Sequence, residues 1–403
     1  MIIGSRCAVC GTEVGVGVPF AWQCPNASID DPHHVLLLVD DGTVPGALDD
    51  PNPFIRFGPR LAWWAFARSN GMSDADCAAL TREVAGGFDI TPFARSDGLS
   101  DRLDLDVWVK DETGNVAGSH KARHLVGILL HLRAAEELGR LPARPPLAIA
   151  SCGNAALAAA ELAQRVDWPL DVFVPTWMDA GFARRLDAAG AITHRSERRA
   201  DDPAGDPAML RFREARLGGS IPFTVQGPEN ALALDGGRTI GWEIAEQAEL
   251  AGVRLDRVVV QVGGGAFATC LGAGLGRSTR LDAVQTEGCA PLAAAWERAA
   301  VIDHPERYWS QVMRPWPDPH SAADGILDDE TYDWIAVVEA MVESGGQPVV
   351  AAESDVLQAN EMARGAGFTV SVTGSAGLAG VLASRTDLHD GSHVAVVMSG
   401  VAR

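Results

Sequence analysis

The feature that most constrains the fold is a regular alternation of short apolar runs with helical patterns, which begins at residue 147 and continues to the C-terminus. Such alternation is typical of parallel βαβ units. We expect strands at 147–150, 170–174, 191–194, 222–225, 257–262, 281–286 and 393–398. We expect helices at 155–165, 180–189, 207–216, 230–250 and 354–366. The pattern therefore predicts an α/β protein with two open, largely parallel sheets.

The residues before this region carry weaker signals. Residues 40–60 contain four prolines and predict an extended linker. Helices are expected at 61–70 and 73–86, and in the second of these Ser73 is the N-cap residue, with Asp74 and Asp76 in the first turn.

Composition and charge exclude several classes of partner. The chain has 53 acidic and 33 basic residues, a formal net charge of -20 and a pI of about 4.8. Such a field repels phosphate backbones, so we expect no nucleic-acid partner. The longest apolar run near the N-terminus, 35–39, is too short to span a bilayer, so we expect no membrane association. An odd count of seven cysteines without a secretory signal favours a reducing compartment, and we predict a cytoplasmic enzyme.

Three cysteines near the N-terminus form a candidate metal site. Cys7 and Cys10 lie in a Cys-x-x-Cys-Gly motif, which is typical of a metal knuckle, and Cys24 follows. A second knuckle would place a further cysteine where the chain has Asn26 and Ala27. Either His33 or His34 would complete a Cys₃His zinc site. The alternative is a metal-free remnant whose cysteines pack as small apolar side chains.

One lysine has the surroundings that carbonyl chemistry needs. A polar loop with two glycines follows an expected strand at 105–109 and leads into an amphipathic helix at 122–138, so Lys121 falls in the first helical turn. The partial positive charge of a helix N-terminus disfavours a second cation and lowers the pKa of such an amine. A lysine of lowered pKa suits Schiff-base chemistry. The alternative is a surface lysine at the end of a loop.

Two later turns join a strand to a helix at the carboxyl ends of expected parallel strands, where open sheets bind ligands. In Ser151-Cys152-Gly153-Asn154-Ala155 the backbone amides suit a carboxylate and the Asn154 amide suits a ring hydroxyl, although this pattern is also a common helix cap. In Gly263-Gly264-Gly265-Ala266 the successive N–H groups form a nest that suits a phosphate.

The second turn has a rival interpretation. Gly263, Gly265 and Ala268 spell G-x-G-x-x-A, and Glu287 lies about twenty residues further, as in a dinucleotide fingerprint. This hypothesis is an NAD(P)-dependent oxidoreductase. The motif occurs late in the chain, however, and leaves Lys121 and the Asn154 turn without a role.

Residues 91–403 resemble the pyridoxal-phosphate enzymes of fold type II, the tryptophan synthase β-subunit-like superfamily that includes threonine synthase and the serine/threonine dehydratases. Four motifs occur in the family's order. They are Lys110-Asp111-Glu112 followed by Gly118-Ser119-His120-Lys121, then Ser151-Cys152-Gly153-Asn154, then Gly263-Gly264-Gly265-Ala266, and last Val397-Met398-Ser399-Gly400.

The resemblance implies roles for these residues. Lys121 would form the Schiff base, with Ser119 and His120 beside the cofactor and Asn154 on its ring hydroxyl. The glycine turn from Gly263 to Ala266 would bind the phosphate, and Ser399 would face the pyridine nitrogen. Ser151, Cys152, Gly153 and Ala155 would surround the substrate carboxylate. Glu287, at another strand end, is a further candidate that would face the substrate ammonium, unless it is solvated or paired.

The resemblance also implies an activity and a domain plan. We expect a lyase or synthase that performs β- or γ-elimination or replacement on a small amino acid, because a neutral serine at the ring nitrogen makes a weaker electron sink than an aspartate. A catalytically silent pyridoxal-phosphate-binding homologue is the alternative. We expect a homodimer, a leader at 1–45, a large cofactor-binding domain at 46–143 with 227–403, and a small mobile domain at 144–226 that carries the Asn154 turn. The cysteine leader resembles one found in front of some threonine synthases.

Overall fold

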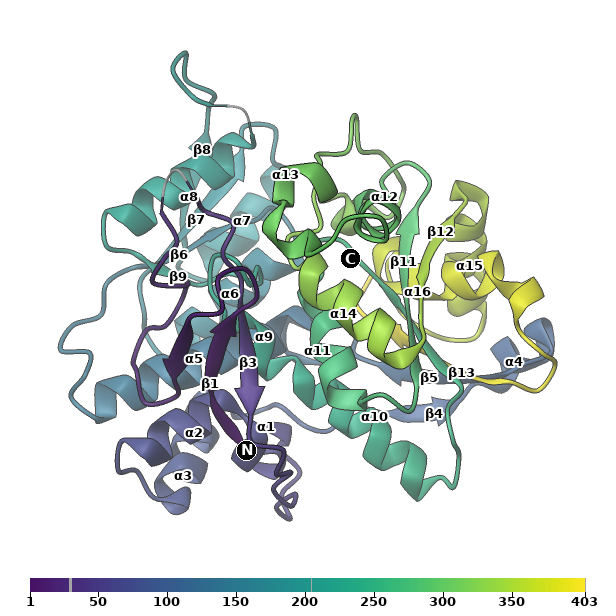
Figure 1. The fold of residues 1–403 in the computed structure, drawn as a ribbon, viewed down its shortest axis with the longest axis horizontal. Helices are drawn as coiled ribbons and strands as arrows, with labels where there is room; N and C mark the ends of the chain where they lie inside the picture. The colour runs from purple at the N-terminus through teal and green to yellow at the C-terminus, as the bar shows by residue number, and fades with distance from the viewer. Residues whose placement is uncertain (29–30, 204, 403) are drawn as a thin grey trace.

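Two separate, largely parallel sheets carry the α/β part of the chain, and a small third sheet forms from the N-terminal residues (Figure 1). The computed structural model describes residues 1–28, 31–203 and 205–402. In Figure 1 the four-stranded sheet lies in the left half and the six-stranded sheet in the right half. The predicted α/β class with open, largely parallel sheets is confirmed.

The four-stranded sheet is entirely parallel and has the strand order β8-β7-β6-β9. Its strands are β6 (Leu147–Ala150), β7 (Leu170–Pro175), β8 (Ile192–Ser196) and β9 (Ile221–Pro222). Its helices are α6 (Asn154–Arg165), α7 (Ala180–Ala188) and α8 (Pro207–Leu217). The expected strands are found within two residues of their predicted limits, except that the last ends at Pro222 instead of extending to residue 225.

The six-stranded sheet has the order β12-β11-β10-β13-β5-β4, and only β4 is antiparallel to its neighbour. Its strands are β4 (Phe93–Arg95), β5 (Asp106–Asp111), β10 (Arg257–Gln261), β11 (Arg280–Thr286), β12 (Pro348–Ala351) and β13 (His393–Met398). Val258 and Val260 pack into one hydrophobic core and Val259 into another, so both faces of this sheet are covered. The sequence pattern missed β4 and β12, which are only three and four residues long.

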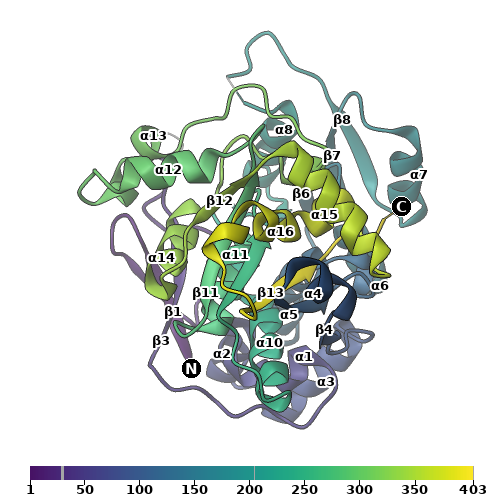
Figure 2. The same ribbon diagram turned by 90° about the vertical axis from the view of Figure 1, so that its right-hand side faces the viewer.

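Helices cover both faces of this sheet. Figure 2 shows α15 and α16 together on one side, and the core on that side also includes α4. The helices of the C-terminal half are α10 (Arg238–Leu250), α11 (Ala266–Leu275), α12 (Pro291–Ala299), α13 (Trp309–Val312), α14 (Trp334–Ser344), α15 (Glu353–Gly365) and α16 (Val372–Ala383), with 3₁₀ turns η3 (Pro305–Arg307), η4 (Asp324–Ile326) and η5 (Arg385–Asp387). No helix in the described part of the chain is both long and apolar enough to cross a bilayer.

The N-terminal residues form an antiparallel sheet in the order β2-β1-β3. Its elements and the helices that follow are β1 (Ile2–Cys7), β2 (Glu13–Gly15), β3 (Leu36–Asp40), α1 (Pro53–Arg56), η1 (Gly58–Arg60), α2 (Ala62–Ser69), α3 (Asp74–Val84) and α4 (Asp97–Leu103). The cap at Ser73 is confirmed, since its hydroxyl accepts from the N–H of Asp76 while the Asp76 carboxylate accepts from the N–H of Ser73.

The prediction that residues 40–60 are an extended linker is wrong in its second half, which contains α1 and η1. Asn52 caps α1 by accepting from the N–H of Phe54. Pro53 stands at the first helical position, where a backbone N–H would have no partner within the helix, so its missing N–H costs no hydrogen bond. Phe54 and Ile55 are buried, so this short helix is held by the core.

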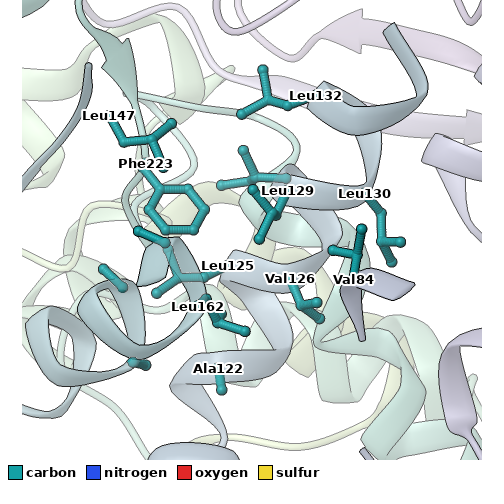
Figure 3. Close-up of a cluster of buried hydrophobic side chains, with 14 of the residues drawn as sticks. Val84, Ala122, Leu125, Val126, Leu129, Leu130, Leu132, Leu147, Leu162 and Phe223 are labelled. Atoms are coloured by element: carbon teal, nitrogen blue, oxygen red, sulfur yellow. The ribbon is translucent and has the colours of Figure 1, made fainter. Parts of the chain in front are cut away.

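Helix α5 (Lys121–Glu137) connects the two halves of the molecule. It is buried almost all round, with fourteen of its seventeen residues in the interior. Figure 3 shows Leu125 and Leu129 of α5 near Phe223, which follows β9, while Val126 and Leu130 lie toward Val84 of α3. One hydrophobic core contains residues on both sides of the expected domain limit at 143, so the core does not mark that limit. The expected domain limits remain a prediction.

The single helix expected at 230–250 is instead two helices, α9 (Ala233–Gly236) and α10, which meet at Gly237. At this point the chain packs closely against α5. A Cβ on Gly236 would lie 2.0 Å from the backbone oxygen of Arg123, and a Cβ on Gly237 would lie 2.5 Å from the ring of His124. These glycines therefore let α9 and α10 approach the first turns of α5.

We expect the Gly236→Ala substitution to lower the free energy of unfolding by about 2–3 kcal/mol, because the new methyl group meets backbone that does not yield easily. The matched control is Gly98→Ala in α4, where a Cβ has its nearest neighbour at 3.6 Å. That change should leave stability unaltered or raise it slightly. Urea unfolding of both variants checks the prediction, and equal midpoints would contradict it.

Candidate active site at the start of helix α5

The turn between β5 and α5 presents Lys121. It contains the 3₁₀ turn η2 (Val116–Gly118), in which Ala117 and Gly118 have positive φ angles of 54° and 70°. Lys121 is the first residue of α5, and its amine makes no hydrogen bond within the described residues. Burial lowers the pKa of this amine, and the carboxylates of Asp328 and Asp333 oppose that shift. The predicted direction is confirmed, but desolvation is the main cause.

The chain contains only two lysines, Lys110 and Lys121. Lys110 is fully buried, and its amine donates to Glu243 Oε2 at 2.6 Å, to Gln247 Oε1 at 2.7 Å and to the backbone oxygen of Thr91 at 2.8 Å. All three hydrogens of that ammonium are thus used in fixed bonds. Lys121 is therefore the only lysine whose amine is available for chemistry.

A buried ion network holds the first turn of α5 in place. Arg123 donates to Glu112 at 2.8 and 2.9 Å and to Glu243 at 2.5 Å, and the three side chains are fully buried. With Lys110 on the same Glu243, two cations balance two carboxylates. Because Glu112 follows β5 and Glu243 lies in α10, the network fixes α5 to both.

Ser399, one residue after β13, lies beside the start of α5. Its hydroxyl oxygen accepts from the backbone N–H of His120 at 3.1 Å and lies 2.5 Å from Nδ1 of the same histidine. The His120 ring stacks on Phe267, with centroids 3.9 Å apart. Burial holds the pKa of His120 well below its usual value, so the ring is neutral. The structure thus gathers His120, Ser399 and the helix after the glycine turn next to Lys121.

The Asn154 turn reaches the same place from the other sheet. Asn154 is the first residue of α6, and the N-cap residue is Gly153, which makes no side-chain capping bond. A Cβ on Gly400 would lie 3.1 Å from Nδ2 of Asn154, so the amide lies against the residue that follows Ser399. Asn154 is therefore not the N-cap residue of α6, and its contact with a ring hydroxyl remains a prediction.

The other residues of this turn take different positions. The Ser151 hydroxyl accepts from the N–H of Gly153 at 3.2 Å, Cys152 is exposed, and Ala155 is buried. The Gly153 amide is thus partly used by the turn itself. The predicted contacts of these residues with a substrate carboxylate remain a prediction.

The glycine turn after β10 is closed over by residues 326–337. A Cβ on Gly263 would lie 2.3 Å from Asp328 Oδ2, and one on Gly264 would lie 3.1 Å from the Tyr332 ring. Gly265 has a φ of 104° at the N-cap of α11, and Ala266 is the first, buried, residue of that helix. Crowding at Gly263 and the positive φ of Gly265 thus favour glycine at these two positions. The backbone of Gly264 already donates to the Asp328 carboxylate, so the turn provides hydrogen-bond donors for an anion.

Two acidic residues near Lys121, the buried Asp333 and the half-buried Asp328, escaped the sequence analysis. Burial raises the pKa of Asp328, and burial together with the charge of Asp328 raises the pKa of Asp333 to about 7. Asp333 Oδ2 accepts from the N–H of Gly227 at 3.3 Å, whereas its Oδ1 has no partner among the described residues. Both acids lie in the run 328–333, whose sequence is typical of a solvated acidic loop, so no sequence signal marks their position near Lys121.

Glu287 is bonded to the backbone of helix α15. It is exposed, and its carboxylate accepts from the N–H of Glu353 at 2.9 Å, at the start of α15. A contact with a substrate ammonium remains a prediction. The same bond also weakens the dinucleotide hypothesis, which needs a free carboxylate for a ribose.

The three N-terminal cysteines come together around one of the two candidate histidines. The ligating atoms of Cys7, Cys10, Cys24 and His34 all lie within 4.8 Å of one another. His33 points elsewhere, because its ring stacks on Trp309 with centroids 4.6 Å apart.

Comparison with known proteins identifies the family. The chain belongs to the pyridoxal-phosphate dependent enzymes, whose family model matches residues 84–400. It is 26% identical over 302 residues to a threonine synthase of Methanosarcina acetivorans, which covers 72% of this chain and 68% of that protein. These matches establish a fold type II enzyme with pyridoxal phosphate as its cofactor, as the sequence motifs predicted.

Solved structures of low sequence identity share the fold. Maize serine racemase superposes with a TM-score of 0.65 at 17% identity, covering 82% of this chain and 93% of that one. The processed form of threonine deaminase isoform 2 from Solanum lycopersicum gives 0.63 at 18% identity, with coverages of 83% and 92%. Diaminopropionate ammonia lyase from Escherichia coli gives 0.64 at 15% identity, with coverages of 81% and 89%.

The residues around Lys121 fit this cofactor. The aldehyde needs an available amine, and Lys121 provides one. The phosphate needs a nest of N–H groups, and the turn at 263–265 presents backbone N–H groups without Cβ atoms in the way. In addition, the buried hydroxyl of Ser119 has no partner among the described residues, so it is available for a polar ligand.

We expect the Arg123→Met substitution to lower the free energy of unfolding by about 3–5 kcal/mol, because it leaves two buried carboxylates with only Lys110 to balance them. The matched control, Arg277→Ala, removes an exposed ion pair with Glu343 and should cause no measurable change. Chemical unfolding of both variants measures the difference. Similar losses in the two variants would refute a special role for the network.

Asp333 gives a pH-dependent prediction for the cofactor-free protein. Its pKa is about 7 in the folded state and about 3.9 in an unfolded chain, so the folded state binds more protons between these values. The stability that Asp333 contributes is therefore complete below about pH 4 and is lost as the pH rises toward 7.

We expect Asp333→Asn to remove this loss. Between about pH 4 and 7, the free energy of unfolding of the variant should rise relative to that of the wild type by up to about 1.4 kcal/mol per pH unit. Urea unfolding at pH 5, 6, 7 and 8 measures it. The control variant, Asp303→Asn at an exposed position, should follow the wild-type profile. A constant difference between Asp333→Asn and wild type across this range would contradict the assignment.

Proposed function

We propose that this protein catalyses β- or γ-elimination or replacement on a small amino acid, in the manner of a threonine/serine dehydratase or a threonine synthase, with Lys121 as the residue that holds the cofactor. The observation that carries the proposal is that Lys121 is the only lysine with an available amine, at the junction of the Asn154 turn, the glycine turn and Ser399. A homodimer and a cytoplasmic location are part of the same proposal.

Each residue has a separate task. Pyridoxal phosphate, when bound, withdraws electrons from the Cα of an amino acid and makes the Cα proton acidic. Lys121, with a pKa lowered by burial, is the base that takes this proton. The N–H groups of the glycine turn bind the phosphate, and the Asn154 amide bonds the ring hydroxyl.

Ser399 determines which reactions are favoured. We assign the neutral His120 tautomer that carries its hydrogen on Nδ1, so that His120 donates twice to the Ser399 oxygen, from its backbone and from its ring. Both lone pairs of Ser399 are then used, and its own hydrogen is free for an unprotonated ring nitrogen. A ring held in this form is a weaker electron sink, which favours elimination and replacement over transamination.

The charged groups near Lys121 support one group of substrates. Asp328 and Asp333 place acidic groups near Lys121, and Lys110 and Arg123 are neutralised by their own partners. A side chain with a hydroxyl or ammonium leaving group suits this surrounding better than a phosphate ester, which would add negative charge. The two acids near Lys121 therefore support dehydratase-like chemistry over replacement of a phosphate.

The cofactor attachment is tested by reduction of the holoprotein. Borohydride should fix the cofactor onto Lys121 and remove the visible absorbance, and peptide mapping should find it only there. Lys121→Ala should retain at most about a tenth of the label, while the control variant Arg277→Ala, at an exposed position, should retain the full amount. Label on Lys110, or colourless protein that does not take up the cofactor, would refute the proposal.

The reaction is tested by a substrate screen on the holoprotein. We expect release of ammonia from serine, threonine or 2,3-diaminopropionate at rates at least tenfold above those with phosphate esters of serine or homoserine, a difference of about 1.4 kcal/mol in barrier. Faster turnover of a phosphate ester would favour the threonine synthase alternative. Racemisation without elimination would exclude the lyase, and cofactor binding without any turnover would identify a silent homologue.

A further inference from the structure

We propose that Cys7, Cys10, Cys24 and His34 bind one zinc ion. Cys10 Sγ lies 3.6 Å from Cys24 Sγ, and Cys7 Sγ lies 3.4 Å from His34 Nδ1. In a tetrahedral zinc site the ligand atoms are separated by about 3.5–3.8 Å, because Zn–S bonds are about 2.3 Å and Zn–N bonds about 2.0–2.1 Å long. These two separations match a tetrahedral zinc site, and all four ligand atoms lie within 4.8 Å of one another.

The backbone around the cysteines has the arrangement of a metal knuckle. The N–H of Cys10 points at Cys7 Sγ at 3.5 Å, and the N–H of Asn26 points at Cys24 Sγ at 3.4 Å. Gly11 has a φ of 74° and closes the turn by donating to the backbone oxygen of Cys7 at 2.9 Å. N–H donors aimed at sulfur stabilise thiolates, which are the form that binds metal.

His34 is oriented from behind by a carboxylate. Its Nε2 lies 3.1 Å from Asp31 Oδ2, which directs Nδ1 toward the cysteines. Metal-binding histidines are usually held in this way through the second ring nitrogen. His34 therefore takes the fourth position, for which the sequence provides no cysteine.

The ligand set favours a structural zinc ion. Three thiolates and one imidazole suit zinc, and four protein ligands leave no open position for a substrate. Cys7, Cys24 and His34 are buried, whereas Cys10 is exposed, so a metal has access from one side only.

The site would fix the leader against the segment next to the active site. The backbone oxygen of Trp22 accepts from the N–H of Ala231 at 2.8 Å, and Gln23 donates to the backbone oxygen of Pro228 at 2.8 Å. The same segment contains Gly227, which donates to Asp333. A zinc ion that links Cys7 to His34 would therefore stabilise the contacts of the leader with the segment 227–231. That segment in turn contacts Asp333, the buried acid near Lys121.

The experiment is zinc analysis of the full-length holoprotein. We expect one zinc ion per chain by mass spectrometry of the metal, and thiolate-to-cobalt charge-transfer bands after exchange with Co²⁺. His34→Ala and Cys10→Ser should each retain at least tenfold less zinc after dialysis against a weak chelator. The matched control, His33→Ala, removes the neighbouring histidine that stacks on Trp309 and should retain the full amount.

A second measurement covers the case in which those variants do not fold. Asp31 is exposed, and Asp31→Asn should fold and bind zinc about tenfold more weakly, since only the orienting bond is lost. Folded wild-type protein that takes up neither zinc nor cobalt, equal zinc loss in the His33 and His34 variants, or a Cys10–Cys24 disulfide in the intact mass would each overturn the proposal. These readouts do not depend on pyridoxal phosphate.

Discussion

The charge network around Arg123 is the interaction on which the active site depends. Two cations and two carboxylates are removed from water together, so each is tolerated only while its partners stay in place. Arg123 lies two residues after Lys121, and its bonds join α5 to the end of β5 and to α10. The same network keeps Lys110 permanently bonded. The position of Lys121 and its status as the one available lysine thus have a common physical cause.

Parallel topology then gathers the remaining groups. The Ser399 segment follows β13, the glycine turn follows β10, and the Lys121 turn follows β5, all neighbours in one parallel sheet whose carboxyl ends share an edge. The Asn154 turn comes from the other sheet. It reaches this edge because α5 packs against that sheet, and so α5 sets the relation between the two halves.

Desolvation sets the protonation of the groups near Lys121. His120 is neutral because it is buried, and Asp328 and Asp333 have raised pKa values for the same reason. The Gly264 amide that donates to Asp328 belongs to the turn assigned to the phosphate. A phosphate bound there would meet this acid, and its raised pKa lessens the repulsion. The chemistry of the site is thereby linked to the closing segment at 326–337.

The sequence by itself determined the α/β class, most strand limits and the four motifs. It could do so because strands buried on both faces are continuous apolar runs, and because turns that bind anions need glycine at fixed positions. The limits of β6 and β13 are those predicted, and the Ser73 cap is a local interaction that the sequence displays directly.

Only the tertiary structure decided which groups meet. It divided the expected helix at Gly237, turned part of the expected linker into α1, and chose His34 over His33. It also buried Asp333, left Asp328 half-buried near Lys121 and paired Glu287 with the start of α15. Periodicity records which face of a segment is apolar, but the partner of a polar side chain is set by packing between residues far apart in the chain.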